Sequence, residues 1–208
     1  MDRVAALFPT PVMHVKQLVD HDLLESMNDD LARQDWFTNK HTDLLTHTEV
    51  VKPTSSPIFL KLRKAILPKL VDFGALLFGE ALKWHVKECW INVLHKGGHQ
   101  ESHSHANSFI SGVVYLNGSH PSSNLVIHRN SGGGQTYMFV NSHETADINP
   151  YNAAKWQSDD IEPGDMILFP SYMLHEVPVN QGEKRVSMAF NALPDRLDSW
   201  GYKVTFGR

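Results

Sequence analysis

Three histidines have the spacing of a metal site. His103 and His105 flank a single serine, and His175 lies far along the chain, just after a short apolar run. In an extended strand the side chains of residues i and i+2 point to the same side, so His103 and His105 can present two imidazoles to one cation. A third ligand from a distant strand, with other coordination positions left open, is the arrangement of mononuclear non-haem iron sites. The pattern predicts His103, His105 and His175 as metal ligands and catalytic residues.

Arg185 indicates a second ligand beside the metal. The expected strand from Arg185 to Ala192 alternates, which places Arg185, Ser187 and Ala189 on one face. A guanidinium that faces the inside of the fold needs a buried partner, and it binds a carboxylate through two parallel hydrogen bonds. The hydroxyl groups of Ser187 and Tyr115 could donate further hydrogen bonds to that carboxylate. These residues favour a dicarboxylate as co-substrate.

Each feature also has an ordinary explanation when taken alone. Among 13 histidines a His-x-His pair arises easily by chance, and a lone strand arginine more often forms a salt bridge. A second pair, His99 and Glu101, has the same spacing and would supply the histidine and carboxylate of the more usual iron triad. We favour His103 and His105 because they directly precede the apolar run at 109–116. Glu101 would then orient an imidazole by a hydrogen bond.

The elements that must position these residues are strands. From Leu82 onward short β-rich runs alternate with turns such as Asn117-Gly118 and Pro163-Gly164, a pattern typical of a sandwich or barrel. We expect a mainly β fold with N-terminal helices, a double-stranded β-helix or jelly roll. The expected strands are Trp84–Leu94, Phe109–Leu116, Asn124–His128, Thr136–Val140, Met166–Phe169, Leu174–Val177 and Arg185–Ala192.

The first third of the chain is expected to be helical. Asp20 has the side chain of an N-cap for a helix that reaches about Arg33. A second helix is expected to open at Ser56 and Pro57, and Pro68 to bend it.

Composition limits the class of protein. With 41% hydrophobic and 20% charged residues, the chain fits one domain over 1–208, with a helical buttress at about 18–80 and a β core at about 84–206. The net charge of −4 gives no basic face for nucleic acid. Cys89 is the single cysteine, which fits a reducing compartment. We find no signal peptide and no apolar run of roughly 18 residues, so we expect a cytoplasmic protein that does not contact a membrane.

Several segments resemble a known family. They are similar to the 2OG-Fe(II) oxygenases of the 2-oxoglutarate/Fe(II)-dependent dioxygenase superfamily, relatives of the prolyl hydroxylases. The segments are HSHANSFISGVVYL at 103–116, IEPGDMILFPS at 161–171, HEV at 175–177, RVSMAFN at 185–191 and WIN at 90–92.

The resemblance implies both cofactors and a reaction. It implies a double-stranded β-helix that binds Fe(II) and 2-oxoglutarate, uses O2, and hydroxylates a substrate with release of succinate and CO2. It matches His175 to the distal metal ligand, and Arg185 and Ser187 to the element that holds the far carboxylate of 2-oxoglutarate. Tyr115 and Asn92 complete the expected co-substrate site. The family pattern usually has a carboxylate where this chain has His105, which leaves the metal with more net positive charge.

Two other functions are consistent with parts of the sequence. A cupin-type three-histidine metalloprotein, a dioxygenase or isomerase without 2-oxoglutarate, would also carry glycines such as Gly97 and Gly164 ahead of its histidines, but it has no need of Arg185. A non-catalytic jelly-roll binding module is the other alternative.

The substrate is left open, and so is the oligomeric state. A peptidyl residue and a small metabolite are both compatible with the sequence. The expected rim of the pocket includes the weakly patterned loop 141–160 and the glycine-rich loop 131–134, where long loops are often functional. The candidate rim aromatics are Tyr137, Tyr151 and Trp156.

Overall fold

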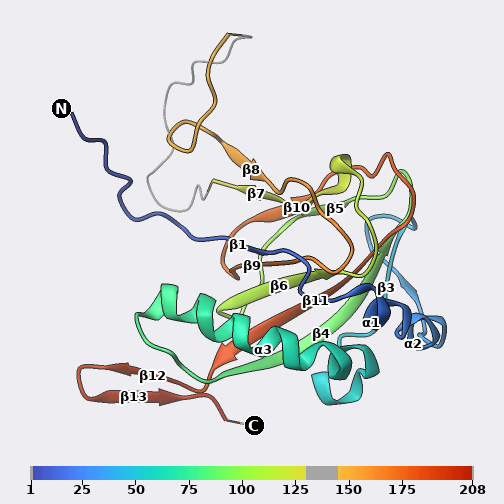
Figure 1. Ribbon diagram of the computed structural model, residues 1–208, viewed down its shortest axis with the longest axis horizontal. Coiled ribbons are helices and arrows are strands. Elements are labelled where there is room, and N and C mark those ends of the chain that lie inside the picture. Colours follow the sequence, from blue (N-terminus) through green and yellow to red (C-terminus); the bar gives the residue numbers. More distant parts are fainter. Residues whose placement is uncertain (1, 130–144, 208) are drawn as a thin grey trace.

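Two β-sheets form the body of the protein, and one long helix covers the larger sheet (Figure 1). The computed structural model describes residues 2–129 and 145–207. The arrangement is the jelly roll that the sequence predicts, mainly β with helices near the N-terminus. The expected strand Thr136–Val140 and the glycine-rich loop 131–134 lie outside the described residues.

The larger sheet is built around two long antiparallel strands that begin and end close to their expected limits. Its seven strands, in spatial order, are β1 (Met13–Val15), β9 (Met166–Pro170), β6 (Ile110–Tyr115), β11 (Arg185–Pro194), β4 (Trp84–Leu94), β3 (Leu45–His47) and β2 (Phe37–Thr38). The strands β1, β2 and β3 come from the part of the chain expected to be helical or irregular. Each of these three strands has only two or three residues, too few to produce a readable alternation.

The smaller sheet includes the strands on which His103 and His175 lie. Its four strands, in spatial order, are β5 (Gln100–His103), β10 (His175–Val177), β7 (Val126–His128) and β8 (Lys155–Gln157). Strand β8 lies within the segment expected to be a loop. A separate hairpin of β12 (Arg196–Ser199) and β13 (Tyr202–Thr205) projects from the end of β11.

The long helix begins where the sequence predicts. Helix α3 (Pro57–Phe78) starts with Ser56 as N-cap, whose side chain accepts a hydrogen bond from the Phe59 N–H, and ends at Gly79 with φ +69°. Pro68 lies inside this helix. Two short 3₁₀ turns complete the set, η1 (Pro53–Ser55) and η2 (Pro121–Ser123).

The first expected helix is divided in two. Asp20 caps α1 (His21–Glu25) as predicted, but α1 ends at Ser26 and α2 (Asn28–Ala32) begins after Met27. The Ser26 hydroxyl donates to the Leu23 carbonyl at 2.7 Å, a local bond that competes with helix continuation. The break lets Met27 enter the core, where it is 1% exposed.

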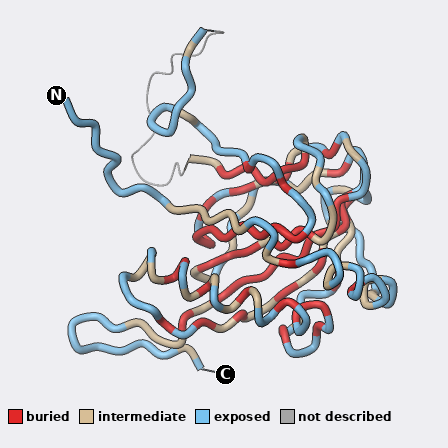
Figure 2. The backbone as a smooth tube through the Cα atoms, viewed as in Figure 1, coloured by how far each residue is buried: buried red, intermediate tan, exposed pale blue. Residues whose placement is uncertain are grey.

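Two apolar layers lie on opposite faces of the larger sheet, and both appear as buried chain in Figure 2. One layer lies between the sheet and α3 and includes Phe73, Met188 and Phe190. The other lies between the two sheets and includes Tyr115 and Phe169. The site therefore forms in the space between the sheets, with α3 supporting the sheet from behind.

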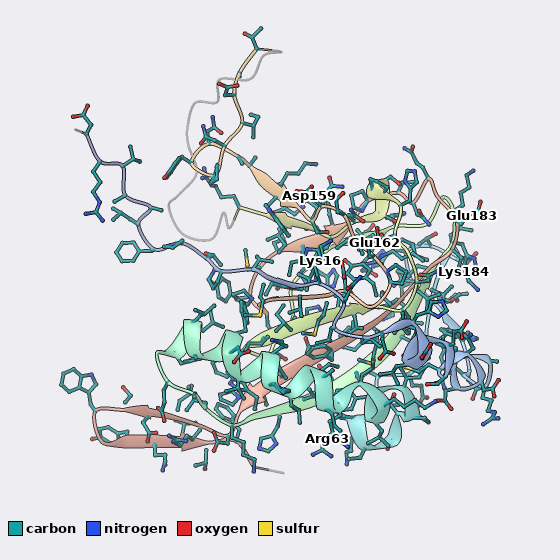
Figure 3. The ribbon with its side chains drawn as sticks, viewed as in Figure 1. Lys16, Arg63, Asp159, Glu162, Glu183 and Lys184 are labelled. Carbon is teal, nitrogen blue, oxygen red and sulfur yellow. The ribbon has the colours of Figure 1, made fainter. Side chains whose placement is uncertain are left out.

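Asp165 joins the N-terminal strand to the turn before β9. Its buried carboxylate accepts hydrogen bonds from the backbone N–H groups of Gln17 and Glu162 and from His14 Nε2, and it lies 3.3 Å from Lys16 Nζ. Figure 3 shows Lys16 and Glu162 close together at this junction. Burial alone would raise the pKa of Asp165, but these hydrogen bonds hold the pKa below its usual value.

Candidate active site

The fold brings the three predicted histidines together. Strand β5 ends at His103 and β10 begins at His175, and these two residues are direct partners in the smaller sheet. His105 lies two residues beyond β5, where its backbone N–H donates to the Ser171 carbonyl at 3.0 Å. The extended-strand argument thus applies to His103 but not to His105, which a backbone hydrogen bond to a different segment positions.

The imidazole rings have the separation that a shared ion requires. The ring centroids of His103 and His175 are 4.3 Å apart, and the centroid of His105 is 5.0 Å from each of them. One ring nitrogen from each histidine lies within 4.8 Å of the others. In residues 2–129 and 145–207, no other group of three or more histidine, cysteine or acidic side chains is this close.

Backbone carbonyls orient two of the three rings. His103 Nδ1 donates to the Glu101 carbonyl at 2.8 Å, and His175 Nδ1 donates to the Met173 carbonyl at 2.9 Å. A protonated Nδ1 in a neutral imidazole leaves Nε2 with a free lone pair. Burial, followed by the charge of His103, lowers the pKa of His175 to about 3 and that of His105 to about 4. Both rings are therefore neutral near pH 7, the state that binds metal.

The alternative pair does not reach this cluster. The Glu101 carboxylate is more than half exposed and lies 3.2 Å from His41 Nδ1. Its backbone carbonyl, rather than its carboxylate, orients His103. His99 lies just before β5 and is not part of the histidine cluster.

Arg185 is buried, and no acidic partner for it lies among the described residues. Figure 3 shows Glu183 and Lys184 on the turn before β11, and the next residue, Arg185, enters the sheet with only 5% of its surface exposed. Its Nε atom has no hydrogen-bond partner within the described part of the chain, and none of the ion pairs found there includes its guanidinium. A charge buried in this way favours a bound anion.

The other predicted co-substrate residues lie at one level across three adjacent strands. Ser187 on β11 is directly opposite Tyr115 on β6 and Asn92 on β4. The Arg185 guanidinium carbon lies 4.9 Å from the centroid of the Tyr115 ring. The Tyr115 hydroxyl is buried and has no hydrogen-bond partner among the described residues. Two unsatisfied polar groups, one cationic and one a hydroxyl, thus lie side by side.

One cavity is lined by members of both groups, although Tyr115 is not among its lining residues. It has a volume of about 80 Å³ and is lined by all three histidines and by Arg185, Ser187 and Asn92. Two aromatic side chains of its lining pack beside the histidines: Trp90 lies 5.7 Å from the His105 ring and Phe169 lies 4.7 Å from the His175 ring, measured between centroids.

Neither Trp90 nor Phe169 was expected from the sequence to line the site. Trp90 has the same alternation on β4 as Asn92, so the strand pattern could have indicated it. Of the candidate rim aromatics, Tyr151 and Trp156 are exposed and do not line this cavity, and Tyr137 lies outside the described residues.

Comparison with known proteins identifies the family. The family model described as "Putative 2OG-Fe(II) oxygenase" matches residues 88–191, which are 104 of the 208 residues. The chain therefore belongs to this family and is a 2-oxoglutarate- and Fe(II)-dependent oxygenase with a jelly-roll fold. The cupin and non-catalytic alternatives are set aside by this match. No curated protein matches the chain.

Solved structures share the fold at low sequence identity. HygX from Streptomyces hygroscopicus, crystallised with nickel, 2-oxoglutarate and hygromycin B, is 15% identical, with a TM-score of 0.65 over 89% of this chain and 83% of that one. A Pseudomonas putida prolyl-4-hydroxylase is 15% identical, with a TM-score of 0.58 over 88% and 92% of the two chains. A 2OG-Fe(II) oxygenase from Burkholderia pseudomallei is 14% identical, with a TM-score of 0.61 over 87% and 83%.

Among the helices within residues 2–129 and 145–207, none combines the length and the apolar character that a membrane span needs.

Proposed function

We propose that this oxygenase binds Fe(II) through His103, His105 and His175, and binds the far carboxylate of 2-oxoglutarate through Arg185. The observation that carries the proposal is the buried Arg185, whose Nε atom has no partner among the described residues, in the cavity that the three imidazoles also line. A metal site alone does not account for that arginine, whereas a dicarboxylate bridging the two ends of the cavity does.

The histidines fit a metal ion in both chemistry and spacing. Two ligand atoms at right angles, each about 2.1 Å from a metal as for imidazole on zinc, lie about 3 Å apart. The Nε2 atoms of His105 and His175 are 3.2 Å apart. Three neutral ligands also leave both positive charges of the ion uncompensated, and the carboxylate of 2-oxoglutarate that is not paired with Arg185 would offset one of them.

Each co-substrate residue has a defined task in this proposal. Arg185 forms two parallel hydrogen bonds to the carboxylate, and its position over the Tyr115 ring holds the guanidinium plane. Tyr115 donates its unpaired hydroxyl, and Ser187 donates its hydroxyl from the adjacent position. Asn92, on the other side of Ser187, supplies an amide at the same level of the sheet.

When bound, Fe(II) and 2-oxoglutarate would supply the oxidising chemistry together with O2, one oxygen atom passing to a substrate C–H bond and the other to succinate as CO2 is released. The residues of this chain hold the iron and the 2-oxoglutarate in fixed positions relative to each other and exclude water. Trp90 and Phe169, packed against the ligand rings, keep the region around the metal apolar. Neutral His105 and His175 remain available as ligands across the physiological pH range.

The substrate in this proposal is a peptidyl residue or a small metabolite, and the site of action is the cytoplasm. Two solved relatives illustrate the two classes of substrate: a prolyl-4-hydroxylase, and HygX with hygromycin B bound. The one cysteine, Cys89, is a buried free thiol, which fits a reducing compartment.

A succinate-release assay tests the proposal. Purified protein with Fe(II), 2-oxoglutarate and O2 should release succinate, and the rate should rise with the correct member of a panel of peptides and metabolites. Omission of Fe(II) should abolish the signal, and Arg185→Ala should lose most of it at a 2-oxoglutarate concentration that just saturates the wild type, whereas Lys184→Ala, which alters the exposed neighbour, should not. Turnover that continues without 2-oxoglutarate would refute the co-substrate assignment.

A further inference from the structure

A polar network lies beside His105 and joins three strands of the larger sheet. Asn191 Nδ2 donates to Glu88 Oε1 at 2.8 Å, and the Ser111 hydroxyl donates to Asn191 Oδ1 at 2.7 Å. The Ser111 and Ser171 hydroxyls are 2.9 Å apart. We call Glu88, Asn191, Ser111 and Ser171 the Asn191 network. Three of these residues lie in the segments that resemble the oxygenase family, yet the proposed metal and co-substrate roles use none of them.

A β-bulge brings Glu88 into this network. Along β11 and β4 the register pairs Asn191 with Glu88 and then Ala192 with Val86, so Lys87 is the extra residue. Val86 packs in the apolar layer against α3. The bulge therefore switches the face of the strand between residues 86 and 88, and it turns the Glu88 side chain toward Asn191.

Glu88 fixes which end of the Asn191 amide faces His105. An ionised carboxylate only accepts hydrogen bonds, so the amide must present its NH2 group to Glu88. The Asn191 oxygen then receives the Ser111 hydroxyl. The same NH2 group lies 3.4 Å from His105 Nδ1. With a donor opposite it, His105 Nδ1 must be the acceptor, which places the proton of the neutral ring on Nε2.

His105 therefore differs from the other two histidines. Its Nε2–H points at His175 Nε2, 3.2 Å away. That nitrogen can accept, because His175 Nδ1 already donates to the Met173 carbonyl. His103 Nδ1 likewise donates to a carbonyl. The rings of His103 and His175 can bind metal through an unprotonated Nε2, whereas Nε2 of His105 carries a proton and donates a hydrogen bond.

We infer that Asn191, oriented by Glu88, is a positioning residue that sets the tautomer of His105. In the metal-free protein His103 and His175 then each have an unprotonated Nε2 that can bind metal, and His105 becomes the third ligand only after its ring proton moves. The inference rests on the proposed metal site. When His105 Nε2 binds metal, the ring proton moves to Nδ1 and no proton is gained or lost by the ring. The Asn191 amide turns over and accepts that proton's hydrogen bond through Oδ1.

Glu88 can release the amide for this movement. Its side chain is 29% exposed, and its Oε1 lies 3.1 Å from Lys87 Nζ. A small rotation toward Lys87 removes the carboxylate from the amide, after which the Asn191 NH2 group can donate to Ser111 instead. Glu88 thus holds the metal-free arrangement without blocking the metal-bound one.

Long-range proton–nitrogen NMR correlation on the metal-free protein at pH 7.5 tests the inference directly, since both buried rings are neutral there. We expect His105 as the Nε2–H tautomer, and His103 and His175 as Nδ1–H tautomers. A wild-type His105 that is protonated at Nδ1 would overturn the inference without the need for any variant.

Two substitutions separate tautomer control from packing. Asn191→Asp keeps the shape but replaces the donor by an acceptor, so His105 should change to the Nδ1–H form. Glu88→Gln can face either end of the amide, so His105 should show both tautomers. The control is Asn124→Asp, at a buried asparagine whose Nδ2 donates only to the Ser158 carbonyl; it should leave all three histidines unchanged. An unchanged His105 in both test variants would refute control by Asn191.

Zinc, as a diamagnetic probe, distinguishes this inference from the proposed function. Adding Zn(II) to the wild-type protein should convert His105 to the Nδ1–H form. Should the metal-free tautomers be as expected but zinc leave His105 unchanged, Asn191 still sets the tautomer but His105 Nε2 is not a ligand, and the three-histidine site is wrong.

Discussion

Replacement of Arg185 should separate co-substrate binding from stability. The side chain is 5% exposed, its Nε atom is unpaired, and the Tyr115 hydroxyl beside it is also without a partner in the described chain. Arg185→Met fills much of the same volume with an apolar chain and removes the charge. Because a buried charge without a partner is costly, this variant should unfold at the same or a higher denaturant concentration than the wild type in the absence of ligand.

The loss of 2-oxoglutarate affinity follows from the hydrogen bonds removed. Each charge-assisted hydrogen bond contributes about 1.5–3 kcal/mol, and truncation of one partner of a buried charge pair costs about 2–5 kcal/mol. A middle value of about 3 kcal/mol corresponds to a Kd raised about 150-fold. Arg185→Lys should restore little of this, because an ammonium group cannot form two parallel hydrogen bonds.

Anaerobic titration calorimetry with the Mn(II)-loaded protein measures this affinity, and urea unfolding measures stability. Lys184→Ala is the matched control, because Lys184 is the exposed neighbour of Arg185 on the same turn. Wild-type affinity for 2-oxoglutarate in Arg185→Met would refute the assignment. A large loss of stability in the ligand-free variant would show that Arg185 has a structural partner instead.

Further predictions concern the metal, the folding of the N-terminal strand and the cysteine. His175→Ala should lose bound Fe(II) or Mn(II) on dialysis, because two ligands make a weak site, whereas Glu101→Gln should keep its affinity within about 10-fold; metal retained by the first variant but lost by the second would reverse the ligand assignment. His105→Asp should still bind Fe(II), since it restores a carboxylate ligand. Metal analysis measures this, and a variant without bound metal would contradict the prediction. Asp165→Asn should lower the unfolding free energy by about 2–3 kcal/mol at pH 7. Because the folded pKa of Asp165 is depressed, the stability that its carboxylate contributes is present above the unfolded pKa of about 3.9 and is lost as the pH falls through the folded pKa. The urea midpoints of the variant and the wild type should therefore converge in acid. Cys89 should resist a thiol reagent in the folded protein and react on unfolding, because burial raises its pKa to about 11 despite the hydrogen bond to Ser56.

Local signals in the sequence were sufficient to predict where the long helix and the long strands begin. Helix α3 has a serine N-cap, a proline at its first position and a glycine after its end, and each of these signals acts within a few residues. Strand β4 begins and ends at the predicted residues, and β11 begins at Arg185 as expected. The same local alternation placed Arg185 and Ser187 on one face, which was sufficient to predict a carboxylate site.

Tertiary structure alone decided how the histidines are held. His105 is not on a strand, and its position depends on a backbone hydrogen bond to Ser171, far along the chain. Glu88 reaches Asn191 only because β11 pairs with β4 across a bulge that turns Glu88 inward. The short strands β2 and β3 depend in the same way on the neighbours they pair with. Local periodicity encodes which side of a strand a residue faces, but side-chain hydrogen bonds between strands depend on pairing and register, which distant parts of the chain set together.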